Sequence, residues 1–127
     1  MPITVTKAFS ICYGHHLPEY DGKCANIHGH NSEIRVTVRK DPNRECYPDM
    51  VMDFGDIKQK AGEVINLLDH QNLNELLPDQ YMPPTAENMA LFLADRLSKP
   101  GVFGPYLVSV RVSETPTSWA EWRAESV

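Results

Sequence analysis

The sequence predicts an α+β fold, in which a four-stranded antiparallel sheet carries two helices on one face. Two segments near the N-terminus and two near the C-terminus alternate apolar with polar residues, as half-buried strands do. Between these pairs lie two segments whose apolar residues recur at helical spacing. The predicted order is therefore strand, strand, helix, helix, strand, strand, within a single domain that spans residues 1–127.

The first two strands are expected at residues 3–11 and 31–40. Both are rich in β-branched residues at alternating positions, which favours an extended backbone with one buried side. Residues 13–26 contain glycine and proline and are expected to form a loop between the two strands. An Asp-Pro-Asn turn at residues 41–43 should end the second strand.

Two helices are expected next. Asp53 is a suitable cap for a helix that runs to about Leu68, and Thr85 for a second helix that ends near Leu97. Each helix has one apolar stripe, which we interpret as a face that packs in the core. Residues 77–84 contain prolines and should form the connection between the helices.

The last two strands are expected at residues 106–113 and 119–125, on either side of a turn at residues 115–117. An open sheet of four strands leaves two edges with unpaired backbone groups. We therefore expect the edges to be used in oligomerisation.

Composition excludes several classes of protein. The formal net charge of −5 argues against nucleic acid or an anionic membrane as a partner, and no apolar run is long enough to span a membrane. The N-terminus lacks the pattern of a signal peptide, so we expect a cytoplasmic protein. The three cysteines should then be thiols, and Cys12 and Cys46 are interpreted as structural or neutral.

Three histidines predict a metal site. His28 and His30 lie two residues apart at the entry of a strand, so their side chains point to the same side. A third imidazole from His15 would complete a three-histidine set, which catalytic zinc sites use while keeping a fourth position open. The alternative is that these are surface histidines on an irregular loop.

Further polar groups are candidates for chemistry. Cys24 precedes His28 by four residues, where a nearby cation would favour its thiolate. The Asp69 carboxylate could hold the His70 imidazole in one tautomer for acid–base chemistry, or His70 could only stabilise a helix end. Glu114 follows an apolar strand and could bind an amino-heterocycle, although an exposed glutamate is the commoner outcome.

Six segments, in one order and over nearly the whole chain, resemble the 6-pyruvoyl-tetrahydropterin synthase family. They are Phe9…His15-His16-Leu17-Pro18, Gly22-Lys23-Cys24-x-x-x-His28-Gly29-His30, Met52-Asp53-Phe54-x-x-Ile57-Lys58, Leu68-Asp69-His70-x-x-Leu73-Asn74, Pro84-Thr85-x-Glu87-Asn88 and Val112-Ser113-Glu114-Thr115. The three residues between Cys24 and His28 resemble the branch of the family that serves queuosine biosynthesis, whereas animal pyruvoyl synthases resemble a version with five.

The resemblance implies the tunnelling fold, in which trimers of four-stranded sheets form a β-barrel and two trimers stack into a hexamer. It also implies a role for each of ten residues. One zinc ion per subunit would be held by His15, His28 and His30. Catalysis would use Cys24 with Asp69 and His70 of a neighbouring subunit. Pterin binding would use Glu114, with Thr85 and Thr115 beside it, and Lys23 is the candidate cation for a triphosphate.

The implied reaction converts 7,8-dihydroneopterin triphosphate into 6-carboxytetrahydropterin and releases acetaldehyde and triphosphate. Two alternatives remain open. One is a pyruvoyl synthase, which eliminates triphosphate without cleaving the carbon side chain. The other is a catalytically silent oligomer that binds a metal or a pterin.

Overall fold

The computed structural model describes residues 3–44 and 47–125, so Cys46 and the interpretation given to it lie outside the described residues. Five strands form one sheet in the order β3-β1-β2-β4-β5. Their bounds are Thr4–His15 (β1), His28–Arg39 (β2), Gln71–Asn72 (β3), Leu107–Thr115 (β4) and Ser118–Arg123 (β5).

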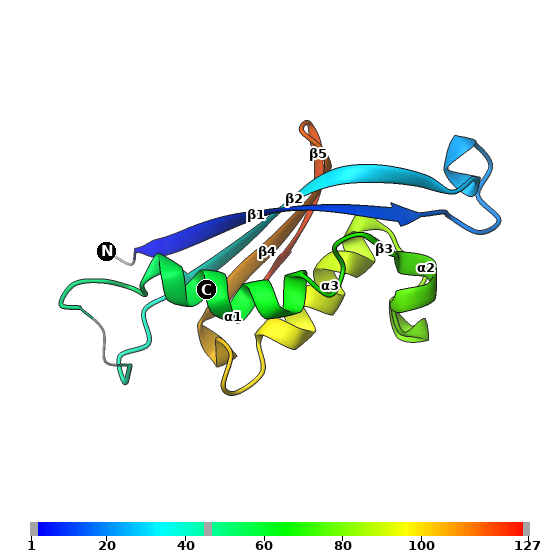
Figure 1. The fold of residues 1–127 in the computed structure, drawn as a ribbon. Helices are drawn as coiled ribbons and strands as arrows, with labels where there is room; N and C mark the ends of the chain where they lie inside the picture. The colour runs from blue at the N-terminus through cyan, green and yellow to red at the C-terminus, as the bar shows by residue number, and fades with distance from the viewer. Residues whose placement is uncertain (1–2, 45–46, 126–127) are drawn as a thin grey trace.

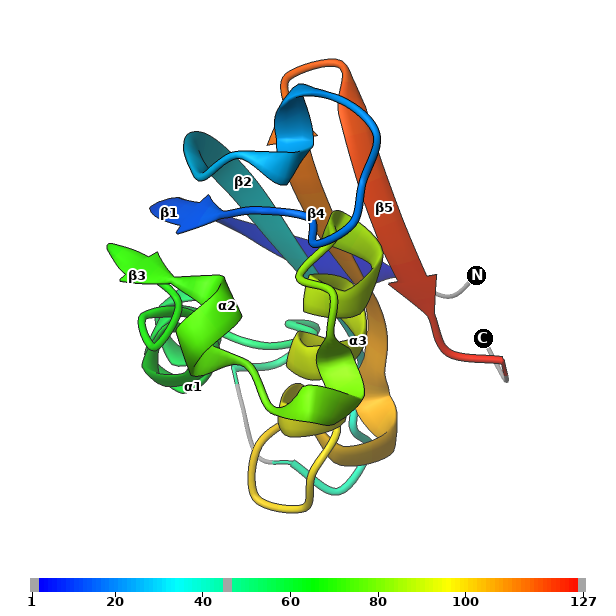
Figure 2. The ribbon, with the colours of Figure 1, turned by 90° about the vertical axis from the view of Figure 1, so that its right-hand side faces the viewer.

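The α-helices lie on one face of this sheet (Figures 1 and 2). The α-helices are Phe54–Ile65 (α1), Leu73–Leu76 (α2) and Ala86–Leu97 (α3), and the 3-10 helices are Lys23–Ala25 (η1), Asp79–Tyr81 (η2) and Gly104–Tyr106 (η3). None of the described helices is long and apolar enough to cross a membrane. The α+β class predicted from the sequence is confirmed.

The core lies between the sheet and the two long helices. Alternation places one side of β2 and β4 against the helices, and Ile34, Val36 and Val110 on that side are fully buried. The expected caps are present: the Asp53 side chain accepts a hydrogen bond from Gly55 N, and the Thr85 side chain accepts one from Asn88 N. Both helices therefore begin where the sequence predicts.

The prediction of a loop at residues 13–26 is wrong for the first three of these residues. Strand β1 continues to His15 and pairs with β2 as far as His28. Tyr13 and His15 keep the inward alternation of the strand, since both are buried. The sequence did not show this alternation, because Gly14 between them has no polar side chain to mark the outer face of the strand.

The predicted count of four strands and two helices is also too low. The short strand β3 pairs in parallel with β1 at Tyr13 and Gly14 and leads directly into α2. Helix α1 ends at Ile65, before the expected Leu68, and a turn connects it to β3. A two-residue strand and a four-residue helix are too short to show a hydrophobic period, which explains why the sequence did not predict them.

We predict that Leu93→Ala lowers the free energy of unfolding by about 2–5 kcal/mol, because Leu93 is fully buried against the sheet. Leu91→Ala on the same helix is the matched control. Leu91 is 43% exposed, so its truncation should change stability by no more than about 0.5 kcal/mol. Urea denaturation of both variants measures the difference, and equal losses would contradict this description of the core.

Candidate metal centre

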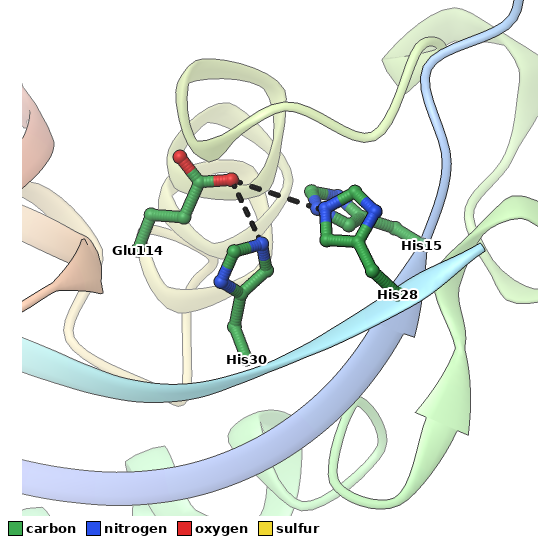
Figure 3. Close-up of side chains that lie close together, drawn as sticks. All are labelled: His15, His28, His30 and Glu114. Carbon is green, nitrogen blue, oxygen red and sulfur yellow. Dashed lines mark hydrogen bonds and ion pairs between the residues drawn. The ribbon is translucent and has the colours of Figure 1, made fainter. Parts of the chain in front are cut away.

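Pairing of β1 with β2 brings three histidines together. His15 lies directly opposite His28, and His30 lies opposite Tyr13, so all three imidazoles project from the helix-covered face of the hairpin (Figure 3). The Nε2 atoms of His15 and His28 are 2.9 Å apart, and the ring of His30 packs edge-on against both. His15 is buried, whereas His28 and His30 are half-buried. The sequence prediction that these side chains converge is confirmed.

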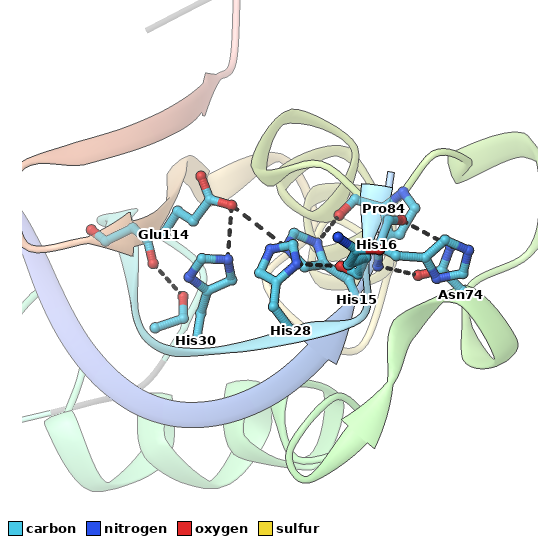
Figure 4. Close-up of polar contacts among 10 residues, drawn as sticks. His15, His16, His28, His30, Asn74, Pro84 and Glu114 are labelled. Atoms are coloured by element: carbon cyan, nitrogen blue, oxygen red, sulfur yellow. Dashed lines mark hydrogen bonds and ion pairs between the residues drawn. The ribbon is translucent and has the colours of Figure 1, made fainter. Parts of the chain in front are cut away.

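Backbone carbonyls fix the tautomers of two of these rings. His15 Nδ1–H donates to the carbonyl oxygen of Pro84 at 2.7 Å, and His28 Nδ1–H donates to that of Asn26 at 2.7 Å (Figure 4). In a neutral imidazole the other nitrogen then carries a lone pair. Burial lowers the pKa of His15 and of His30, which favours their neutral, metal-binding form. The Nε2 atoms are thus prepared as acceptors.

This donor set fits a metal cation. When both rings are neutral and carry their proton on Nδ1, the Nε2 lone pairs of His15 and His28 face each other at 2.9 Å and repel unless a cation lies between them. Nitrogen ligands at about 2.0–2.1 Å from a tetrahedral zinc are themselves about 3.3 Å apart, which is close to this separation. His30 Nε2 is buried and, although it lies 3.1 Å from Glu114 Oε1, it makes no hydrogen bond of normal geometry among the described residues.

Glu114 lies in the same cluster. It is on β4 beside β2, and its Oε1 is 3.1 Å from His30 Nε2 and 3.5 Å from His15 Nε2 (Figure 3). One atom from each of the four side chains falls within 4.8 Å of the others, so together they could hold a metal ion. Sequence reasoning gave Glu114 a substrate-binding role and missed its closeness to the histidines. Its alternation with Val110 and Val112, both buried, indicated only that Glu114 lies on the inner face of the sheet.

Tyr13 is a further polar residue of the site that the sequence did not reveal. It is 4% exposed, and its ring contacts the rings of His15 and His30. Its hydroxyl has no hydrogen-bond partner among the described residues. Burial, reinforced by the negative charge of Glu114, raises the pKa of this phenol, so it remains a neutral donor beside the cluster.

Asp69 and His70 form the pair that the sequence suggested. Asp69 Oδ1 lies 3.0 Å from His70 Nδ1 and accepts a 2.9 Å hydrogen bond from the backbone N–H of Cys12. That bond, with the His70 charge as a smaller cause, lowers the pKa of Asp69. The His70 side chain is 78% exposed, and its φ of 58° is rare outside glycine. Cys12 and His70 line a groove of about 540 Å³ together with His28.

The remaining candidate residues lie outside the four-residue cluster. Cys24 and Lys23 lie on η1, and the carbonyl of Cys24 accepts a hydrogen bond from Leu17 N at 2.7 Å. Cys24 is half-buried and is not part of the four-residue donor cluster in the described chain. Thr85 caps α3, and Thr115 at the end of β4 lies 3.4 Å from Thr117, Oγ1 to Oγ1. Their proposed roles in binding a substrate remain predictions.

Residues 4–125 match the model of the family described as 6-pyruvoyl tetrahydropterin synthase. The chain belongs to this family. A 6-carboxy-5,6,7,8-tetrahydropterin synthase of Synechocystis sp. is 38% identical over 93% of this chain and 91% of its own length. A 6-pyruvoyl tetrahydrobiopterin synthase of Poecilia reticulata is 35% identical over 97% of this chain and 90% of its own.

A solved structure shares the architecture of this member of the pterin synthase family. The 6-pyruvoyl tetrahydropterin synthase of Caenorhabditis elegans superposes with a TM-score of 0.75 and 26% sequence identity, covering 98% of this chain and 97% of that one. The family resemblance stated from the six sequence segments is confirmed. Because the chain is similar to both carboxy and pyruvoyl synthases, an experiment has to identify the product of its reaction.

We predict that Tyr13→Phe leaves the metal-free protein as stable as the wild type or slightly more stable, because a buried hydroxyl without a partner costs about 1–3 kcal/mol. Tyr81→Phe is the matched control. The Tyr81 hydroxyl donates to Asp95 Oδ2 at 2.6 Å, so its loss should destabilise by about 1 kcal/mol. Thermal unfolding in the presence of a chelator compares the two, and destabilisation by Tyr13→Phe would show that its hydroxyl is paired.

Proposed function

We propose that this chain is a zinc-dependent 6-carboxy-5,6,7,8-tetrahydropterin synthase. It would act as one domain over residues 1–127, in the cytoplasm, in the synthesis of the queuosine precursor. The proposal rests on the convergence of three histidine ring nitrogens, with Cys24 four residues before His28. The name of the Synechocystis relative supports the carboxy product.

His15, His28 and His30 would hold the metal, which supplies Lewis-acid polarisation of an oxygen on the substrate side chain. Three neutral ligands leave the full charge of a divalent ion for this purpose. The chain contributes the orientation: Pro84 and Asn26 carbonyls hold the rings so that the Nε2 atoms face inward. The hydroxyl of Tyr13 is a further donor at the same place.

Proton transfer would be carried out by Cys24 with Asp69 and His70. A thiolate at Cys24 can accept a proton from a carbon that is made acidic by polarisation of its neighbour. The Asp69 carboxylate lies 3.0 Å from His70 Nδ1 and holds the imidazole in place, so that His70 can act as the partner acid or base. We propose that this pair comes from a neighbouring subunit. It stands on the β3 edge of the sheet and is open to solvent in a single chain.

The assembly is proposed to be a hexamer made of two trimers. The outer edge of β5 lacks a neighbouring strand within the described residues, and β3 covers β1 only at Tyr13 and Gly14. Such edges pair readily with another chain. The pterin triphosphate substrate would then bind between subunits, with Thr85 and Thr115 near the pterin and Lys23 near the triphosphate.

Incubation of the purified zinc-loaded protein with 7,8-dihydroneopterin triphosphate, followed by mass analysis of the products, tests the proposal. We expect 6-carboxytetrahydropterin together with acetaldehyde and triphosphate. A pyruvoyl product without acetaldehyde would favour the alternative, a 6-pyruvoyl-tetrahydropterin synthase, to which the Poecilia and Caenorhabditis proteins belong by name. Unchanged substrate that stays bound would indicate a silent binding protein.

We predict that Cys24→Ala abolishes turnover, because the variant lacks the proposed proton carrier. Its zinc content should stay the same, because Cys24 lies outside the donor cluster. Cys12→Ala is the matched control, since the Cys12 thiol contacts Asn31 and only its backbone holds Asp69. Metal analysis and product formation are measured on both variants. Loss of zinc from Cys24→Ala would make the thiol a metal ligand and contradict this mechanism.

We predict that Glu114→Gln reduces kcat/KM by about two to four powers of ten, because an amide cannot accept two hydrogen bonds from a 2-amino-4-oxo heterocycle as a carboxylate does. The zinc content should be unaffected if Glu114 anchors the pterin. Since Oε1 also lies 3.1 Å from His30 Nε2, weaker zinc binding in this variant would instead identify Glu114 as a fourth ligand. Activity within a few-fold of the wild type would exclude both roles.

A further inference from the structure

The side chain of Asn74 binds both backbone groups of His16, the residue that follows the ligand His15. Asn74 Oδ1 accepts a hydrogen bond from His16 N at 2.9 Å, and Asn74 Nδ2 donates one to His16 O at 3.0 Å (Figure 4). An amide side chain has one acceptor and donors on the same planar group, as a peptide has. It can therefore replace a neighbouring strand at one position.

The register of the sheet explains why a replacement is needed here. Parallel pairing matches Tyr13 with Gln71 and Gly14 with Asn72, so the next steps of the ladder would bring His16 opposite residue 74. The chain turns into helix α2 at Leu73, and its backbone leaves the sheet. The Asn74 side chain returns to the position that the backbone has left. Asn72 assists this turn, since its Oδ1 accepts a hydrogen bond from Asn74 N at 3.1 Å.

This contact fixes the end of β1 on its second edge. On the other edge His15 pairs with His28 in the hairpin, and the strand stops there. Without Asn74, the two backbone groups of His16 would lack the partner seen here, at the point where β1 enters the loop. The direction of the His15 side chain depends on the orientation of this strand end, because its ring must reach both Pro84 O and the other two histidines.

We propose that Asn74 is a positioning residue of the metal centre, which holds His15 in the geometry that binds the ion. This inference rests on the zinc site of the proposed function and adds a residue that touches no ligand atom. Residues that orient ligands from outside the metal's own contacts typically change affinity by 10–100-fold when removed. Asn74 should act on metal binding through His15, with little dependence on the stability of α2.

The test is zinc affinity, measured by competition with a chromophoric chelator on the full chain. We expect Asn74→Ala to bind zinc about 10–100-fold more weakly than the wild type. Asn72→Ala is the matched control, because it removes the cap of α2, including the hydrogen bond from Asn74 N, but keeps the side-chain carboxamide of Asn74 that binds His16. It should weaken binding by no more than a few-fold. Equal losses in the two variants, or wild-type affinity in Asn74→Ala, would overturn the inference.

A double-mutant cycle separates positioning from a general effect on the fold. In a His15→Ala background the further change Asn74→Ala should cost no zinc affinity, because the side chain that Asn74 positions is gone. In a His30→Ala background the same change should still weaken binding. Equal effects in both backgrounds would contradict action through His15. A wild-type chain that binds no zinc would contradict the metal centre itself, and this inference with it.

Discussion

The pairing of β1 with β2 around His15 and His28 is the constraint on which the site depends. Because side chains alternate along a strand, this register puts His15, His28 and His30 on the helix-covered side together. A shift by one residue would move the His15 side chain to the opposite face relative to the other two. The pairing of β2 with β4 then adds Glu114 to the same cluster. The fold thus delivers four donor groups from three neighbouring strands without any contribution from a long loop.

The electrostatics of this cluster favour a bound cation over hydrogen bonding among the four side chains alone. Carbonyl oxygens of Pro84 and Asn26 take the Nδ1 protons, and burial opposes protonation of His15. The Nε2 atoms of His15 and His28 are left as lone pairs that face each other, and Nε2 of His15 lies 3.5 Å from a carboxylate oxygen of Glu114. A buried arrangement of acceptors without a donor is costly unless a positive charge satisfies it. The hydroxyl of Tyr13, which has no hydrogen-bond partner among the described residues, adds a neutral donor beside them.

Much of this arrangement could be predicted from sequence, and the rest could not for physical reasons. The spacing of His28 and His30 fixes a shared side, and the side chains of Asp53 and Thr85 fix helix starts, so each of these is a local signal. The strand β3 and helix α2 are too short to produce a hydrophobic period. The place of Glu114 among the histidines depends on which strands become neighbours, which alternation within one strand does not specify. The contact of Asn74 with His16 depends in the same way on pairing between segments far apart in the chain.

X-ray absorption spectroscopy at the zinc edge of the loaded protein tests the three-histidine site. Such a site should show nitrogen and oxygen neighbours at about 2.0–2.1 Å, with the outer-shell scattering of three imidazole rings and no sulfur. Replacing His15, His28 or His30 with alanine, one at a time, should each remove one imidazole from that pattern. A sulfur neighbour at about 2.3 Å would contradict the account, because Cys24 would then be a ligand and could not serve as the proton carrier.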